Sequence, residues 1–153
     1  MNIDEKLKSL GIELPTPVKP VANYVPWVKS GNLVFLSGQL PFLNGKINLK
    51  GQVGAEVSPE AAAAEARQCA INLITQMRDA CDGDLSKVKR IVKITGFVAS
   101  PAHFADHALV MNGASNFLVE VFGEAGRHAR SSVGVASLPM NVPVEIEAII
   151  EVA

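Results

Sequence analysis

The sequence predicts a single α+β domain of two layers, in which one β-sheet is backed by two α-helices. Two long segments, which begin at Ser58 and at Ala102, carry apolar residues at helical spacing. Segments rich in β-branched and aromatic residues are predicted to be strands. Together with the two helices they give the order strands, helix, strand, helix, two strands. Two amphipathic helices that pack against one sheet produce this class. A chain of 153 residues without repeats fits one domain, residues 1–153.

Residues 1–20 are expected to form a helix and a proline-rich extension ahead of the sheet. Ile3 to Leu10 has apolar residues at helical spacing with charges between them, and Gly11 closes this short helix. Leu14 to Pro20 contains three prolines, which remove backbone donors and fix φ. This part is therefore predicted to be an extended segment on the surface.

Two hairpins are expected next. Tyr24 to Lys29 and Leu33 to Ser37 have the composition of strands, and Ser30-Gly31-Asn32 turns the chain between them. The stretch from Phe42 to Ile47 contains Asn44-Gly45, a pair that supplies the positive φ values of a tight turn.

The first long helix has the clearest signals. Ser58 is a good N-cap, Pro59 suits the first helical position, and Glu60 favours the positive end of the helix dipole. Asp82-Gly83-Asp84 ends the helix, and Leu85 to Lys89 adds one turn. The apolar stripe consists of Ala62, Ala66, Cys69, Ala70, Leu73 and Met77.

The second half of the chain alternates strand and helix. Ile91 to Ala99 is rich in β-forming residues, and a second helix is predicted from Ala102 to Phe122. Two strands follow within Ala129 to Glu147, joined by a turn-rich link that contains Leu138-Pro139. The inward residues of the second helix are predicted to be Phe104, Ala108, Met111, Ser115, Leu118 and Phe122.

Composition and charge exclude several classes of protein. The net charge of −1 and the absence of a basic run argue against nucleic-acid binding. No apolar run approaches the ~20 residues of a membrane span, and the first residues lack the apolar core of a signal peptide, so we expect a soluble cytoplasmic protein. Cys69 and Cys81 are interpreted as buried, inert thiols. His103 and His107 could share a helix face, but without a third ligand type at metal spacing no metal site is expected.

Arg130 and Glu145 are the most informative polar residues. A guanidinium binds a carboxylate through two parallel hydrogen bonds, and Arg130 stands at the head of a strand beside a glycine-containing loop. Glu145 and Glu147 alternate with apolar residues, so they point away from the core, toward water or another subunit. From the spacing alone, an anion-binding pocket and a structural ion pair between Arg130 and Glu145 both remain open.

The stretch from Ala129 to Glu147, A-R-S-S-V-G-V-A-S-L-P-M-N-V-P-V-E-I-E, resembles the C-terminal signature of the reactive intermediate deaminase family (RidA, or YjgF-like, also called endoribonuclease L-PSP). Tyr24, Ser37-Gly38-Gln39 and Asn112 extend the resemblance in the same order. It implies a chorismate-mutase-like fold, a homotrimer with a ligand cleft at each subunit interface, and no cofactor. The implied activity is hydrolysis of reactive enamines and imines, such as 2-aminoacrylate, to 2-keto acids and ammonia.

The resemblance also assigns roles to residues. Arg130 would bind the substrate carboxylate, and Glu145 would hold or activate the attacking water. Tyr24 would line the cleft, Gly38 would let the backbone approach the ligand, and Asn112 would support the site by hydrogen bonding.

Three residues near Arg130 differ from the family pattern. Ser132, which belongs to the predicted substrate-binding set, stands where many deaminases carry cysteine. Gly134 stands where they often carry glutamate, and His128 where proline is common. The alternatives to a deaminase are a binding protein for small carboxylates that uses the same cleft and, with less physical support, a ribonuclease or translation inhibitor.

Overall fold

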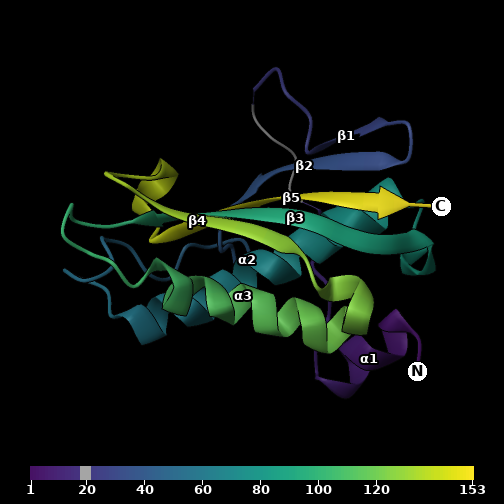
Figure 1. Ribbon diagram of the computed structural model, residues 1–153, viewed down its shortest axis with the longest axis horizontal. Helices are drawn as coiled ribbons and strands as arrows, with labels where there is room; N and C mark the ends of the chain where they lie inside the picture. Colours follow the sequence, from purple (N-terminus) through teal and green to yellow (C-terminus); the bar gives the residue numbers. More distant parts are fainter. Residues whose placement is uncertain (18–21) are drawn as a thin grey trace.

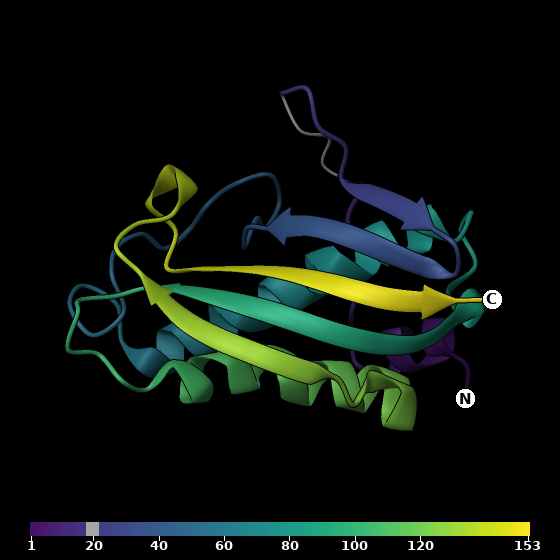
Figure 2. The ribbon, with the colours of Figure 1, turned by 45° about the horizontal axis from the view of Figure 1, so that its top comes forward.

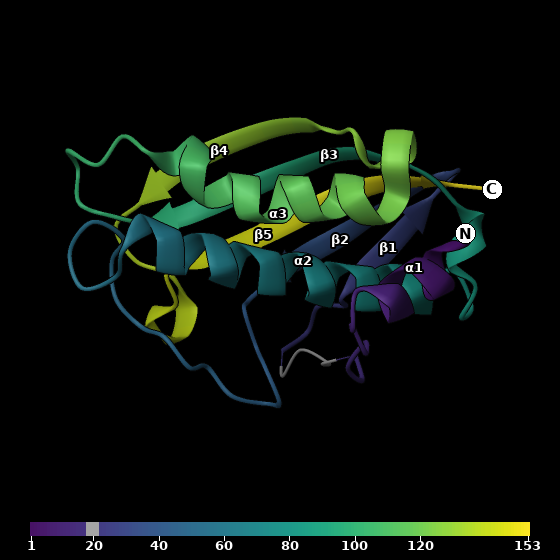
Figure 3. The ribbon, with the colours of Figure 1, turned by 90° about the horizontal axis from the view of Figure 1, so that it is seen from below.

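The computed structural model describes residues 1–17 and 22–153 as two layers, a five-stranded sheet with helices on one face (Figure 1). This confirms the predicted α+β class. Seen from the helix side, α2 and α3 run across the sheet, and the short α1 lies near one end of it (Figure 3). The elements are α1 (Ile3–Ser9), β1 (Trp27–Ser30), β2 (Leu33–Gln39), α2 (Pro59–Ala80), η1 (Leu85–Lys87), β3 (Val88–Ala99), α3 (His107–Phe122), η2 (Gly123–Gly126), β4 (Ala129–Val135), η3 (Pro139–Asn141) and β5 (Val144–Val152).

The strand order is β1-β2-β5-β3-β4, so β3 lies between the last two strands of the chain (Figure 2). β3 and β4 are parallel because the crossover through α3 brings the chain back to the same end of the sheet. The other neighbouring pairs are antiparallel. Consequently β4 is an edge strand, and it is separated from β5 although only a short link joins the two.

The first long helix forms as predicted. The Ser58 side chain accepts a hydrogen bond from the Ala61 N–H at 3.1 Å, an N-cap that contributes roughly 1 kcal/mol. All six residues of the predicted apolar stripe are buried. α3 packs closely on this helix, since a β-carbon at Gly113 would collide with the Ala63 carbonyl oxygen. The two cysteines, Cys69 and Cys81, are buried thiols, as expected.

The second long helix begins at His107 and not at Ala102 as predicted. Pro101 starts a turn in which its carbonyl accepts from the Phe104 N–H at 3.1 Å, and this turn uses the residues that the helical spacing had assigned to the first helical turn. The buried face is therefore rotated from the prediction. Met111, Leu118 and Phe122 are buried as predicted, but Ala108 is exposed, Ser115 and Phe104 are half-buried, and the face also includes Val110, Ala114, Phe117 and Val121.

The hairpins differ in extent from the prediction. The first strand begins at Trp27 rather than Tyr24, because Pro26 cannot donate to a ladder, and its partner continues to Gln39. The predicted second hairpin is only a tight turn, closed by a bridge between Leu43 and Lys46, with positive φ at Asn44 and Gly45.

The N-terminal extension packs onto the domain. Asn2 and Glu5 form a capping box for α1, and Leu7 is buried in the common core. Residues 12–17 form no helix or strand, in keeping with the predicted extended segment. The remainder of that predicted segment, residues 18–20, lies outside the described residues. Within the part of the chain that the structure describes, no helix combines the length and apolar character that crossing a bilayer requires.

Candidate functional site

The pairing of the strands decides which face each candidate residue occupies. Residues directly opposite each other in a ladder share a face, and successive residues of one strand alternate. Arg130 is paired with the buried Ile94, so its side chain leaves on the helix-covered side of the sheet. Glu145 is paired with Phe97, three residues further along β3, and lies on the open side. The two predicted catalytic residues therefore leave the sheet on opposite faces.

Arg130 is held against α3 by neutral acceptors. Its Nη1 donates to Asn112 Oδ1 at 2.9 Å and to Ser115 Oγ at 3.1 Å. Asn112 and Ser115 are three residues apart and so lie on one side of the helix. His128 Nε2 is 2.8 Å from the same Ser115 hydroxyl. We call Arg130, Asn112, Ser115 and His128 the arginine half-site.

Ser132 and Gly134 continue the row of Arg130 along β4. The Ser132 hydroxyl oxygen is buried and makes no hydrogen bond, so in the single chain it is not open to a ligand. A β-carbon at Gly134 would lie 2.7 Å from His107 Nε2 and 2.9 Å from Ser100 Oγ. The glycine is what allows the imidazole and the hydroxyl to approach the strand, and a larger residue would displace the ring.

Glu145 lies directly against Gly38. β2 has one residue more than β5 between the pairs Leu36–Ala148 and Gln39–Ile146, and this bulge brings the glycine to the carboxylate. A β-carbon at Gly38 would collide with Glu145 Oε2. Because Gly38 has no side chain, it leaves room above the strand for the carboxylate of Glu145.

Tyr24 immediately precedes a residue that is hydrogen-bonded to the same bulge. The Ser37 hydroxyl donates to the carbonyl of Val25 at 2.9 Å, which ties the segment that follows Tyr24 to β2. The Tyr24 side chain is 59% exposed. We call Tyr24, Gly38 and Glu145 the glutamate half-site.

Burial sets the charge properties of Glu145. The side chain is half-buried, and this desolvation raises the pKa of the carboxyl group above its ordinary value. Repulsion from the neighbouring carboxylate of Glu147 raises the pKa further. A carboxyl group with a raised pKa accepts a proton more readily at neutral pH, which suits a general base.

A single chain does not bring the two half-sites together. β3 separates β4 from β5, which places the two backbones about 10 Å apart across the sheet, and the side chains diverge from there. The ion pair between Arg130 and Glu145 that the spacing left open does not form. The ion pair found among the described residues joins Arg127 to Glu124, with 3.0 Å between Nε and Oε1.

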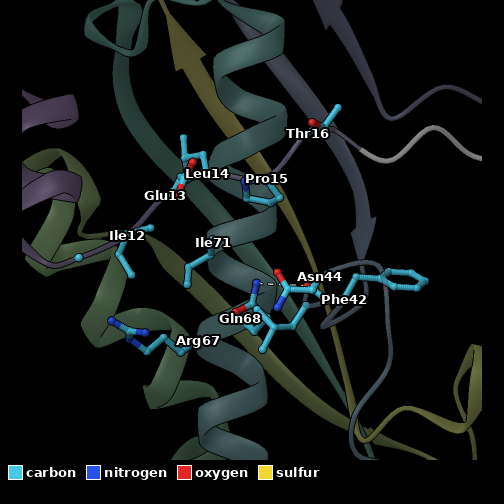
Figure 4. Close-up of a pocket in the computed structure, with 12 residues that line it drawn as sticks. Ile12, Glu13, Leu14, Pro15, Thr16, Phe42, Asn44, Arg67, Gln68 and Ile71 are labelled. Carbon is cyan, nitrogen blue, oxygen red and sulfur yellow. Dashed lines mark hydrogen bonds between the residues drawn. The ribbon is translucent and has the colours of Figure 1, made fainter.

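Two of the cavities that described residues line lie away from both half-sites. One, of about 540 Å³, is formed where residues 11–16 cross α2 beside Phe42–Asn44, with Arg67, Gln68 and Ile71 on the helix (Figure 4). The other, of about 340 Å³, lies beside His107 and Gly134. Neither cavity is lined by Arg130 or Glu145, so neither is the pocket for the predicted reaction.

The structure changes the positions of the two histidines that the sequence could place on one helix face. His103 lies in the turn before α3, so it does not share a helix face with His107. Across residues 1–17 and 22–153, no three side chains of histidine, cysteine, aspartate or glutamate gather as metal ligands.

Sequence reasoning missed two residues of the arginine half-site, Ser115 and His128. Ser115 was assigned to the core because of its helical spacing, but the rotated face of α3 turns it toward β4. A polar residue three positions after Asn112 on the same side of a helix was the available signal. His128 stood out only as a departure from the family pattern.

Comparisons with known proteins agree with this architecture. The model of a family described as "YjgF/chorismate mutase-like, putative endoribonuclease" matches residues 4–151. The chain is 45% identical over 146 residues to protein TCP17 of Trypanosoma cruzi, covering 95% of this chain and 91% of that protein. It is 39% identical over 129 residues to the 2-iminobutanoate/2-iminopropanoate deaminase of Escherichia coli K12, covering 84% and 87%. A crystal structure of a protein of unknown function from Agrobacterium tumefaciens matches with a TM-score of 0.93 at 50% identity, covering 99% and 92%.

Proposed function

Because the chain belongs to the YjgF/chorismate mutase-like family, which includes the reactive intermediate deaminases, we propose that it hydrolyses reactive 2-enamino and 2-imino acids. The products are a 2-keto acid and ammonia. Curated relatives at 30% to 39% identity carry the name of this deaminase activity, which supports the proposal at the level of the family.

The observation that carries the proposal is the state of Arg130. Its two hydrogen bonds go to an amide and a hydroxyl, and no carboxylate of the described residues pairs with it. Both bonds use Nη1, which leaves the other guanidinium N–H groups for a ligand. An oriented guanidinium without an acidic partner is suited to bind a substrate carboxylate.

The chemistry requires a base near the carbon beside that carboxylate. In the proposed reaction, Glu145 takes a proton from water as the water oxygen bonds to C2 of the protonated imine. Glu145 then gives this proton to the nitrogen of the carbinolamine, the C–N bond breaks, and the hydroxyl proton passes to the departing ammonia as the carbonyl forms. The atoms balance as iminium plus water giving keto acid plus ammonium. Because imines hydrolyse readily, holding the carboxylate and the water in place supplies much of the rate.

We propose that the cleft forms between copies of the chain, in a homotrimer. The separation of the half-sites within one chain supports this, since a second chain has to supply the missing half. The open face of the sheet also supports it, because this face exposes Val28, Phe35 and Val133, at 53%, 45% and 44%. An apolar sheet face of this kind favours assembly.

Binding of small carboxylates without turnover is the second candidate. It is favoured by the fact that the arginine half-site is complete in one chain, whereas Glu145 is remote from it. The deciding experiment generates 2-aminoacrylate with a pyridoxal-phosphate dehydratase and follows pyruvate. The deaminase is expected to accelerate pyruvate release above the spontaneous rate, in proportion to its concentration. Thermal stabilisation by pyruvate or benzoate without any acceleration would support the binding protein instead.

The raised pKa of Glu145 predicts the pH dependence of the reaction. The base form is lost as the pH falls, so kcat/KM is expected to fall on the acidic side at a pH above the ordinary pKa of glutamate. Glu147→Gln removes a repulsion that raises this pKa, so the acidic limb should move to lower pH. A pH–rate profile measures both effects.

Glu120→Gln is the matched control, since Glu120 is an exposed acid on α3. Its acidic limb should coincide with that of the wild-type protein. An acidic limb that stays in place in Glu147→Gln would argue against Glu145 as the base.

A further inference from the structure

A chain of hydrogen bonds leads from Arg130 back to the main chain. Arg130 Nη1 donates to Ser115 Oγ at 3.1 Å, Ser115 Oγ lies 2.8 Å from His128 Nε2, and His128 Nδ1 lies 2.7 Å from the carbonyl oxygen of Gly126. The chain therefore connects β4, α3 and the segment between η2 and β4.

The direction of each bond follows from the chemistry of its groups. A carbonyl oxygen only accepts, so His128 Nδ1 carries a hydrogen and donates it to Gly126. The neutral ring then presents a lone pair at Nε2, to which the Ser115 hydroxyl donates. With its hydrogen committed, the Ser115 oxygen turns lone pairs toward Arg130. All the bonds run in one direction, an arrangement in which each bond polarises and strengthens the next.

The end of this chain is fixed by packing. Gly126 is buried, and a β-carbon on it would collide with the Leu118 carbonyl oxygen of α3. The carbonyl that orients His128 is thus held by the close contact between η2 and the end of α3. The Gly126 carbonyl oxygen, which accepts from His128, therefore belongs to a buried, closely packed part of the backbone.

The surroundings favour the neutral ring that this chain requires. His128 is half-buried, and desolvation lowers its pKa. The positive charge of Arg130 lowers the pKa as well, while the bond to Gly126 acts in the opposite direction. The nearby Arg127 has its own acidic partner in Glu124.

We propose that His128 is a positioning residue for the carboxylate-binding arginine, acting through the Ser115 hydroxyl. Its Nδ1-protonated, neutral form fixes the rotation of that hydroxyl, which in turn fixes Arg130 Nη1 between Ser115 and Asn112. The inference rests on the proposed function in one respect, that Arg130 is the group that binds the substrate carboxylate. The sequence position is one where this chain departs from the family pattern, so the device is expected to be particular to chains with this histidine.

The test compares His128→Ala, Ser115→Ala and the double variant, using benzoate as the ligand and NMR of the side chains. Each single variant should raise the Kd of benzoate by about 3- to 10-fold, and the double variant should be no worse than either, because the two residues act as one unit. In turnover, KM should rise while kcat stays near that of the wild-type protein. Ser115→Thr keeps a hydroxyl and should restore most of the affinity, and His103→Ala, an exposed histidine outside the chain of bonds, is the matched control.

Two NMR signals decide the inference independently of any ligand. The ¹⁵N shifts of His128 should show a hydrogen on Nδ1 at neutral pH, and the Arg130 Nε–H signal should lose order in both alanine variants. A hydrogen on Nε2 of His128, or an Arg130 signal that both variants leave unchanged, would overturn it. If benzoate fails to bind the wild-type protein, the proposed function is in error, while these signals still decide the positioning role.

Discussion

Arg130→Ala is expected to lower kcat/KM for 2-iminopropanoate by about 30- to 1,000-fold, which corresponds to about 2–4 kcal/mol of lost binding to the carboxylate. The loss is large because hydrogen bonds between a guanidinium and a carboxylate are charge-assisted and paired. The variant is measured by pyruvate release and by the Kd of benzoate. The value of kcat/KM and the affinity for benzoate should fall by a similar factor if the arginine binds the carboxylate equally in the ground state and the transition state.

Arg127→Ala provides the matched control for that experiment. Arg127 is three residues before Arg130 in the sequence, but its side chain is exposed and already paired with Glu124. Its removal should leave kcat/KM and the Kd within about twofold, since exposed ion pairs contribute only about 0–1 kcal/mol. Arg130→Lys should recover part of the loss, because an ammonium group keeps the charge without the planar fork. Equal losses in the Arg127 and Arg130 variants would mean that net charge, and not a specific site, governs the reaction.

The parts of the fold that local signals determine were predicted closely from the sequence. Helix α2 has a serine cap, a proline in its first turn and an uninterrupted apolar stripe, and all of these act within a few residues. The predicted start of α3 was wrong because Pro101 and Phe104 close a turn ahead of the helix. The apolar spacing continues through this turn and so resembles a longer helix. The hydrogen bond of this turn, and not the spacing of apolar residues, sets where the helix begins. The amino-acid composition does not reveal such a bond.

The relation between the two halves of the site depends on topology. The alternation in β5 predicted that Glu145 faces away from the core, and Val144, Ile146 and Ala148 are buried on the other side. The alternation carries no information on the strand order, however. The insertion of β3 keeps Arg130 and Glu145 one strand apart, and their register against β3 puts them on opposite faces of the sheet. The sequence could place each residue on its strand but could not place the strands.

The separation of the half-sites makes a strong prediction about mixtures. Arg130→Ala and Glu145→Gln should each be nearly inactive as pure proteins, since a missing general base costs about 10²- to 10⁴-fold. When the two are co-expressed with different tags, some clefts combine an intact Arg130 from one chain with an intact Glu145 from another. In a closed ring of three that contains both variants, one of the three clefts is intact, so about a third of the wild-type activity should return. The activity is measured on the doubly tagged assembly, together with its native mass, which should be that of three chains.

A second mixture separates this result from other causes of recovery. Gly38→Val places a side chain against Glu145, so it damages the same half-site as Glu145→Gln. In a mixture of these two variants every cleft receives a damaged glutamate half-site, whichever chain supplies it, and no activity should return. Recovery in this second mixture, or its absence in the first from correctly assembled trimers, would show that the cleft is not built from these halves of two chains. Recovery confined to the first mixture would mean that Arg130 and Glu145 act together only across a subunit boundary, because within one chain the sheet keeps them on opposite faces.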